Sequence, residues 1–157
     1  SYNYYRIYNK IIIIMSEEDV KYRLKYNFQN PVGTMIRAYL RQHQFETRFT
    51  YHVIESVEQV DDDTVKVVNR YDFYSSIFPL RETVYIKRNE MKLESSLTSD
   101  SRPEVVQQKD VLEDAGNGST EFSRLLIALG GNRDFKINAF KNTVLDLAMT
   151  LKAEHWM

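Results

Sequence analysis

The feature that most constrains the fold is a long run of alternating apolar and polar residues. Between residues 46 and 129 apolar side chains recur at every second position, and short polar turns interrupt them. Such alternation is typical of β-strands with one buried face. The turns divide the run into six predicted strands, at residues 46–60, 65–73, 80–87, 91–97, 105–112 and 120–129. Six consecutive strands joined by short turns predict an antiparallel meander.

Other patterns flank this meander. A β-branched run predicts a further strand over residues 4–14, and residues 16–28 follow with a helix-like start and apolar residues at four-residue steps. A second short helix is expected over residues 35–42. Residues 134–152 form the longest amphipathic pattern of the chain. Its apolar stripe consists of Ile137, Phe140, Val144, Leu147 and Leu151.

This order of elements is that of the helix-grip fold of the START/Bet v 1 superfamily, in which the last helix lies across a curved sheet. We therefore expect an α+β fold of the order β-α-α-β6-α. It would be a curved antiparallel seven-stranded sheet closed by the long C-terminal helix, with a cavity between them. The length of 157 residues, without linkers or repeats, indicates a single domain over residues 1–157.

The last helix also carries a second stripe, which is apolar in its middle and polar at both ends. The stripe consists of Asn138, Lys141, Leu145, Ala148 and Lys152. If the first stripe packs on the sheet, the second would face the cavity, with Leu145, Ala148 and Met149 as lining residues. Asn138 and Lys141 would then meet the polar head of an amphiphile. A solvated first helical turn explains these two residues equally well.

The composition argues against several classes of protein. The chain has no cysteine, and its 21 basic residues form no run within a net charge of -1, which argues against nucleic acid as a partner. The three histidines are far apart in sequence, so no metal site is expected. We find no serine-nucleophile motif and no phosphate loop, and we predict neither catalytic residues nor an enzyme.

Several short motifs resemble the PRELI/MSF1 family of mitochondrial intermembrane-space phospholipid-transfer proteins, which share the helix-grip fold. The matching residues follow the first predicted helix, open and follow the second strand, and begin the last helix. They are Lys25, Tyr26, Asn30 and Pro31, then His52, Val53, Ile54 and Arg70, and finally Phe135, Asn138 and Lys141.

The resemblance implies a phospholipid as ligand and no other cofactor. Lys25 and Asn138 would hold the lipid phosphate, with His52, Arg70 and Lys141 as further candidates. The implied location is mitochondrial, in the intermembrane space or at the inner membrane. The implied partners are the membrane surface and a small helical chaperone.

An alternative hypothesis follows from two departures from this family. About seventeen extra residues follow Pro31, and the lid segment is reduced to "YSSIFPLRE". The chain could then be an accessory subunit of a larger mitochondrial membrane complex, docked through residues 32–48 with Tyr39, Phe45 and Phe49 as anchors. A Bet v 1-like enzyme or carrier of small hydrophobic molecules is a third alternative. In each case we expect the apolar face of the added helix to be covered, by the chain's own sheet or by another subunit.

Overall fold

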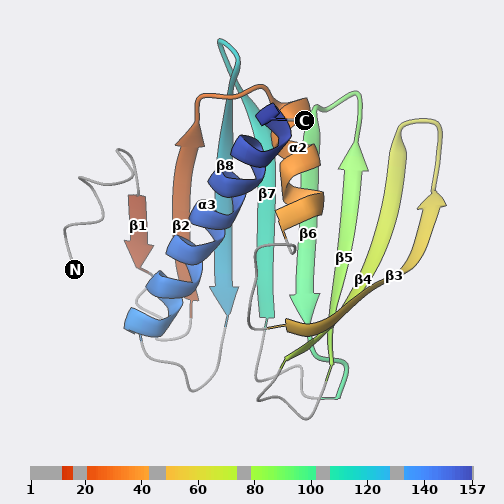
Figure 1. The fold of residues 1–157 in the computed structure, drawn as a ribbon, viewed down its shortest axis with the longest axis vertical. Helices are drawn as coiled ribbons and strands as arrows, with labels where there is room; N and C mark the ends of the chain where they lie inside the picture. The colour runs from red at the N-terminus through yellow and green to blue at the C-terminus, as the bar shows by residue number, and fades with distance from the viewer. Residues whose placement is uncertain are drawn as a thin grey trace.

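The computed structural model describes residues 12–15, 21–42, 49–73, 79–101, 107–127 and 133–156. They form one eight-stranded sheet, with two described helices packed on one of its faces (Figure 1). The elements are β1 (Ile12–Met15), β2 (Lys21–Phe28), α2 (Val32–Arg41), β3 (Phe49–Gln59), β4 (Thr64–Phe73), β5 (Leu80–Lys87), β6 (Lys92–Thr98), β7 (Gln107–Gly116), β8 (Ser119–Ile127) and α3 (Arg133–Trp156).

The strands β3 to β8 form the predicted antiparallel meander. The order across the sheet is β1-β2-β8-β7-β6-β5-β4-β3, so the last strand of the meander pairs with β2. Strands β1 and β3 are the two edges. The predicted helix-grip fold is confirmed, because the meander is followed by a long C-terminal helix that lies across the sheet (Figure 1).

One predicted element is wrong. Residues 16–28 were expected to form a helix, but Lys21–Phe28 is the strand β2, which pairs with β1 and with β8. Leu24, Tyr26 and Phe28 alternate with polar residues, and aromatic residues favour strands. The sequence is therefore compatible with a strand, by its alternation, and with a helix, by its apolar residues at four-residue steps. Hydrogen-bonded neighbours on both sides, β1 and β8, favour the strand. The sheet therefore has β2 in addition to the predicted strands. Of the first predicted strand, 4–14, residues 12–14 lie in β1 and the remainder lies outside the described residues.

The core lies between the helices and the face of the sheet that they cover, which we call the inner face. Register places the buried side chains of six strands on this face, because residues directly opposite in neighbouring strands point to the same side. These side chains are Leu24, Phe122, Leu112, Leu93, Val84 and Val67. From the helices, Met35, Ala38 and Tyr39 of α2 and Val144 and Leu147 of α3 complete the core.

The apolar face of α2 is covered by the chain's own sheet and α3, which confirms the expectation for the added helix. Met35 and Tyr39 are buried, and Ile36 and Leu40 pack against the core. The helix α3 contacts β2 and α2, and α2 in turn contacts β7 and β8. Among the described residues, no helix combines the length and the apolarity needed to span a bilayer.

Candidate functional site

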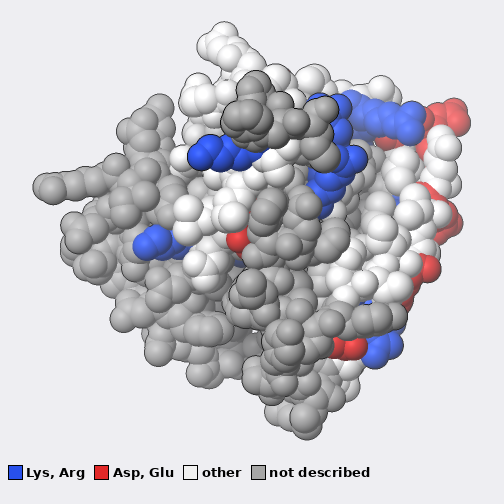
Figure 2. Space-filling model, viewed as in Figure 1, with Lys and Arg blue, Asp and Glu red and all other residues white. Residues whose placement is uncertain are grey.

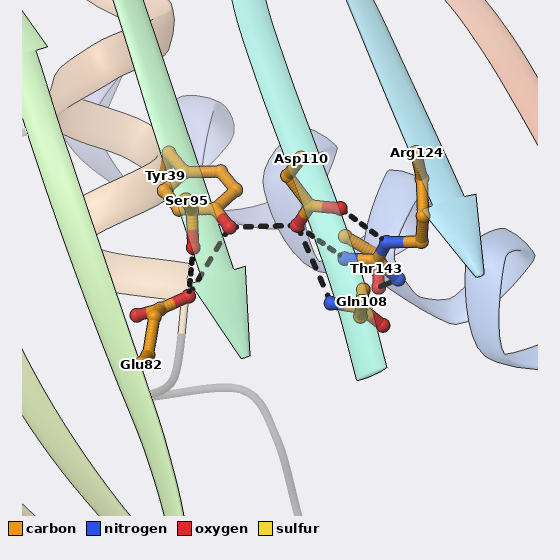
Figure 3. Close-up of polar contacts among 7 residues, drawn as sticks. All are labelled: Tyr39, Glu82, Ser95, Gln108, Asp110, Arg124 and Thr143. Carbon is orange, nitrogen blue, oxygen red and sulfur yellow. Dashed lines mark hydrogen bonds and ion pairs between the residues drawn. The ribbon is translucent and has the colours of Figure 1, made fainter. Parts of the chain in front are cut away.

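A row of buried polar side chains crosses the apolar core at its centre. We call it the inner polar cluster; its members are Tyr39, Asn69, Glu82, Ser95, Asp110 and Arg124. One residue comes from α2 and the other five from the neighbouring strands β4 to β8. Figure 3 shows all of them except Asn69. Every buried polar side-chain atom of the described residues has a hydrogen-bond partner.

Asp110 and Arg124 form a bidentate ion pair at one end of the cluster. They lie directly opposite each other on β7 and β8, with Nε–Oδ1 and Nη2–Oδ2 distances of 2.7 and 2.8 Å. Burial opposes the charge of Arg124, but Asp110 beside it raises the pKa of the guanidinium above its ordinary value. The remaining nitrogen, Nη1, donates to Thr143 Oγ1 at 2.8 Å and so connects the sheet to α3.

The Tyr39 hydroxyl bridges two carboxylates. It lies 2.7 Å from Asp110 Oδ2 and 3.1 Å from Glu82 Oε2, and its single proton can be donated to only one of them at a time (Figure 3). Burial raises the pKa of Tyr39 well above its ordinary value, and the charges of Asp110 and Glu82 raise it further. Tyr39 therefore remains a neutral donor held between two acids.

Glu82 is a buried carboxylate whose partners are neutral. Its Oε1 accepts hydrogen bonds from Asn69 Nδ2 and the Tyr71 hydroxyl, both at 3.0 Å, and its Oε2 accepts one from the Ser95 hydroxyl at 3.0 Å. Burial and the neighbouring Glu82 raise the pKa of Tyr71 far above its ordinary value. Within the described ranges, no cationic side chain lies at ion-pair distance from Glu82, so neutral hydrogen-bond donors stabilise it.

His52 connects the cluster to the edge strand β3. Its Nε2 lies 3.1 Å from Asn69 Oδ1, and its ring stacks on Tyr71 with centroids 4.7 Å apart. Because Asn69 Nδ2 donates to Glu82, Oδ1 is the acceptor for His52, and Nε2 carries the proton. A chain of polar contacts thus runs from the edge strand to α3, and within it the Tyr39 hydroxyl donates to either Glu82 or Asp110.

The structure separates the predicted head-group residues. His52 lies on the inner face beside the cluster, as register with Tyr71 shows. Lys25 and Arg70 lie on the outer face, where Lys25 pairs with Glu121 at 3.5 Å and Arg70 with Asp72 at 3.6 Å. The prediction that these two basic residues share one head-group site with His52 is therefore wrong. For Lys25 the cause is the strand β2, which turns alternate residues away from the core.

The prediction that three residues of α3 line an interior cavity is also wrong. Leu145, Ala148 and Met149 are exposed, because the helix buries its other side. The buried residues of the described part of α3 are Thr143, Val144, Leu147 and Thr150. Lys141 is half-buried at the border between the two sides. The side chain of Asn138 lies outside the described residues, so its head-group role stays a prediction.

The charged members of the cluster were missed by the sequence analysis, although a signal for them exists. Glu82 lies two residues from each of the buried residues Leu80 and Val84, so it points to the same face of its strand. Arg124 stands in the same relation to the buried Phe122 and Leu126. A charged residue in the inward register of a strand is costly unless it is paired. Listing such residues by strand parity would have found Glu82 and Arg124 from the sequence.

The chemistry of the cluster is hydrogen bonding and charge pairing. Within the described part of the chain, no group of three or more His, Asp or Glu side chains is placed to hold a metal ion. The cluster and the neighbouring Tyr71 offer two carboxylates, two tyrosine hydroxyls, an amide, a serine hydroxyl and a guanidinium. These groups suit the recognition of a polar group in an otherwise apolar interior.

No protein-family model and no curated protein matches the sequence. Solved structures do match the fold. Human StAR-related lipid transfer protein 5 has a TM-score of 0.58 at 13% identity, covering 98% of this chain and 92% of that one. Human STARD10 has a TM-score of 0.56 at 10% identity and covers 93% of this chain and 75% of that one. The Zhui aromatase/cyclase from Streptomyces sp. R1128 has a TM-score of 0.52 at 8% identity and covers 85% and 92%.

These identities establish the fold alone. The chain has the helix-grip fold of the START/Bet v 1 superfamily, and proteins with this fold include lipid-transfer domains and an aromatase/cyclase. A common fold does not by itself determine function, which has to be argued from the site.

Proposed function

We propose that the protein is a non-enzymatic lipid-binding domain that holds one lipid between the sheet and the two helices. The observation that carries the proposal is Glu82, a buried carboxylate with neutral partners at the centre of an apolar interior. A hydroxyl or amine donor at the polar end of a lipid would replace one of the neutral donors around Glu82. Its acyl chain would replace apolar contacts of the core, and each buried methylene would contribute about 0.8 kcal/mol.

The sequence motifs support a finer form of this proposal. The resemblance to the PRELI/MSF1 family suggests a phospholipid as ligand and a mitochondrial location, in the intermembrane space or at the inner membrane. It also suggests the membrane surface and a small helical chaperone as partners. In this form Asn138, Lys141 and His52 remain head-group candidates, whereas Lys25 and Arg70 face away from the interior.

A matched pair of variants tests the proposal. Glu82→Gln keeps the shape of the side chain but removes its charge. It should weaken binding of a fluorescent phosphatidylethanolamine, whose ammonium group can donate to Glu82, about tenfold, because a hydrogen bond to a charged group is stronger than a neutral one. The control is Glu94→Gln, which makes the same change on the outer face of β6, where Glu94 pairs with Lys87 and Lys92. Equal affinities of the two variants, or no binding by the unchanged protein, would contradict the proposal.

The alternative function is an accessory subunit of a larger mitochondrial membrane complex, and one observation favours it. Tyr39 belongs to the added segment 32–48, and its ring and hydroxyl occupy the centre of the inner face, where a ligand would bind. The interior would then be filled by the chain itself. Tyr39 is not a docking anchor, because it is buried, and the side chains of Phe45 and Phe49 lie outside the described residues. Co-migration of the protein with a large complex after gentle extraction of native membranes would support this alternative.

A further inference from the structure

The exposed side of α3 carries an apolar patch. Leu145 and Met149 are 40% and 49% exposed and lie one helical turn apart, with Ala148 exposed between them. Each lies two residues from the buried Leu147, and at about 100° per residue this places both on the opposite side of the helix from it. The helix therefore presents one apolar side to the core and a second one to the surface.

Basic residues lie beside this patch on both helices, and one half-buried acidic residue, Asp146, is its neighbour on α3. Lys152 is exposed on the same side of α3, and the neighbouring helix α2 exposes Arg37 and Arg41 one turn apart. The two helices pack against each other, so their exposed sides form one surface. We call this surface the helical face and define it by Arg37, Arg41, Leu145, Met149 and Lys152.

The charges of the molecule are unevenly distributed. Figure 2 shows Lys and Arg over α2 and near the C-terminal end of α3, with a smaller acidic area between the helices, whereas most of the Asp and Glu in this view line the edge of the molecule at β3. The exposed apolar residues of that edge, Ile54 and Val57, have acidic neighbours at Glu55 and Glu58. The helical face combines exposed apolar side chains with exposed basic residues of two neighbouring helices.

We propose that the helical face docks on an anionic lipid surface. Leu145 and Met149 would enter the boundary between head groups and acyl chains, as the apolar side of an interfacial helix does. Arg37, Arg41 and Lys152 would lie at the level of the lipid phosphates, where each basic residue strengthens binding. Docking in this orientation does not depend on what the interior binds.

Sedimentation with vesicles tests this proposal. The unchanged protein should bind vesicles of phosphatidylcholine mixed with phosphatidylserine, and bind vesicles of phosphatidylcholine alone much more weakly. Reversing two charges with Arg37→Glu and Lys152→Glu should reduce binding at least tenfold, since each basic residue contributes about fivefold. Replacing Leu145 and Met149 with serine should reduce binding to both kinds of vesicle.

The controls make the same changes elsewhere on the surface. Lys66→Glu with Lys109→Glu reverses two charges on the outer face of the sheet, and Ile54→Ser with Val57→Ser removes the apolar residues of the β3 edge. Both controls should leave vesicle binding unchanged. Equal binding to both vesicle types would overturn the proposal, and so would controls that reduce binding as much as the test variants. It would also be overturned if the protein does not bind vesicles but forms a dimer, and the Leu145→Ser and Met149→Ser variant is a monomer. A protein that contains no lipid in its interior can still pass this test, so the two proposals fail independently.

Discussion

At the scale of single residues, the buried ion pair of Asp110 and Arg124 is the costliest feature of the interior to disturb. Both side chains are almost fully buried, and their hydrogen bonds satisfy Arg124 from two directions. Removing one partner leaves an uncompensated charge in a poorly hydrated site. The free energy lost in that case exceeds the net contribution of the intact pair.

We therefore predict that Arg124→Met lowers the free energy of unfolding by about 3–5 kcal/mol. The double variant Asp110→Leu with Arg124→Met should recover about half of this loss, because no unpaired charge remains. Urea denaturation of the three proteins measures both quantities. A single variant that costs less than about 1 kcal/mol would show that the pair is solvated.

The tyrosines of the interior predict a stability loss at alkaline pH. The pKa of Tyr39 is raised well above its ordinary value of about 10, so the unfolded chain releases this proton at a lower pH than the folded chain. The contribution of Tyr39 is fully present below pH 10 and decreases as the pH rises above it, by about 1.4 kcal/mol per pH unit. In Tyr39→Phe this slope should be absent, so the stability difference between the two proteins should shrink above pH 10. Parallel curves for the two proteins would contradict the assigned environment of Tyr39.

The residues of the site differ in how far the sequence could predict them. His52 was identified from a motif and does lie beside the inner polar cluster. Glu82 was not identified and Tyr39 was predicted to be a docking anchor, because their partners come from strands and a helix that are distant in sequence. Strand parity indicates that Glu82 points inward, but only the packed structure shows that its partners are neutral donors.

At the scale of elements, α3 shows why a helix with two apolar stripes is ambiguous. The apolar stripe correctly predicted that Val144 and Leu147 are buried, whereas the side chains of Ile137 and Phe140 lie outside the described residues. The stripe did not predict on which of its sides the core continues. The buried side of α3 also includes Thr143 and Thr150. Both are polar, but each side chain has a hydrogen bond that compensates for its burial. Thr143 accepts from Arg124, and the Thr150 hydroxyl donates to the Asp146 carbonyl at 2.8 Å.

A pair of substitutions on α3 tests this assignment. Thr143→Val keeps the shape of the side chain but leaves a buried Arg124 nitrogen without its acceptor, which should cost about 1–3 kcal/mol of stability. Leu145→Ser, on the exposed side, should change stability by less than about 0.5 kcal/mol. Thermal or urea unfolding checks both values. The reverse order of the two effects would place the other side of α3 against the sheet.

The strand β2 has a sequence that is compatible with both a helix and a strand. Its sequence fits a helix by the spacing of Leu24 and Phe28, and it fits a strand by the alternation of Leu24, Tyr26 and Phe28. Local propensity does not decide between the two. Pairing with β1 on one side and β8 on the other does, and those partners are formed only in the complete sheet.

At the scale of the whole molecule, the meander and the long C-terminal helix were enough to predict the helix-grip fold, although the first predicted helix is the strand β2. A meander of six strands needs a cover for its apolar face, and α3 is the only long helix among the described elements. The contents of the interior were not predictable in this way. They depend on α2, which brings Tyr39 between Glu82 and Asp110 and so determines how much room a ligand would have.

The most direct test of the central claim is native mass spectrometry of the purified protein after incubation with phospholipid vesicles. The proposed function predicts a folded protein that carries one lipid molecule, and a smaller bound fraction for Glu82→Gln than for Glu94→Gln. A folded protein that shows only the mass of the bare chain, at every lipid concentration, would contradict lipid binding in the interior. That result would favour an accessory subunit whose interior is filled by Tyr39.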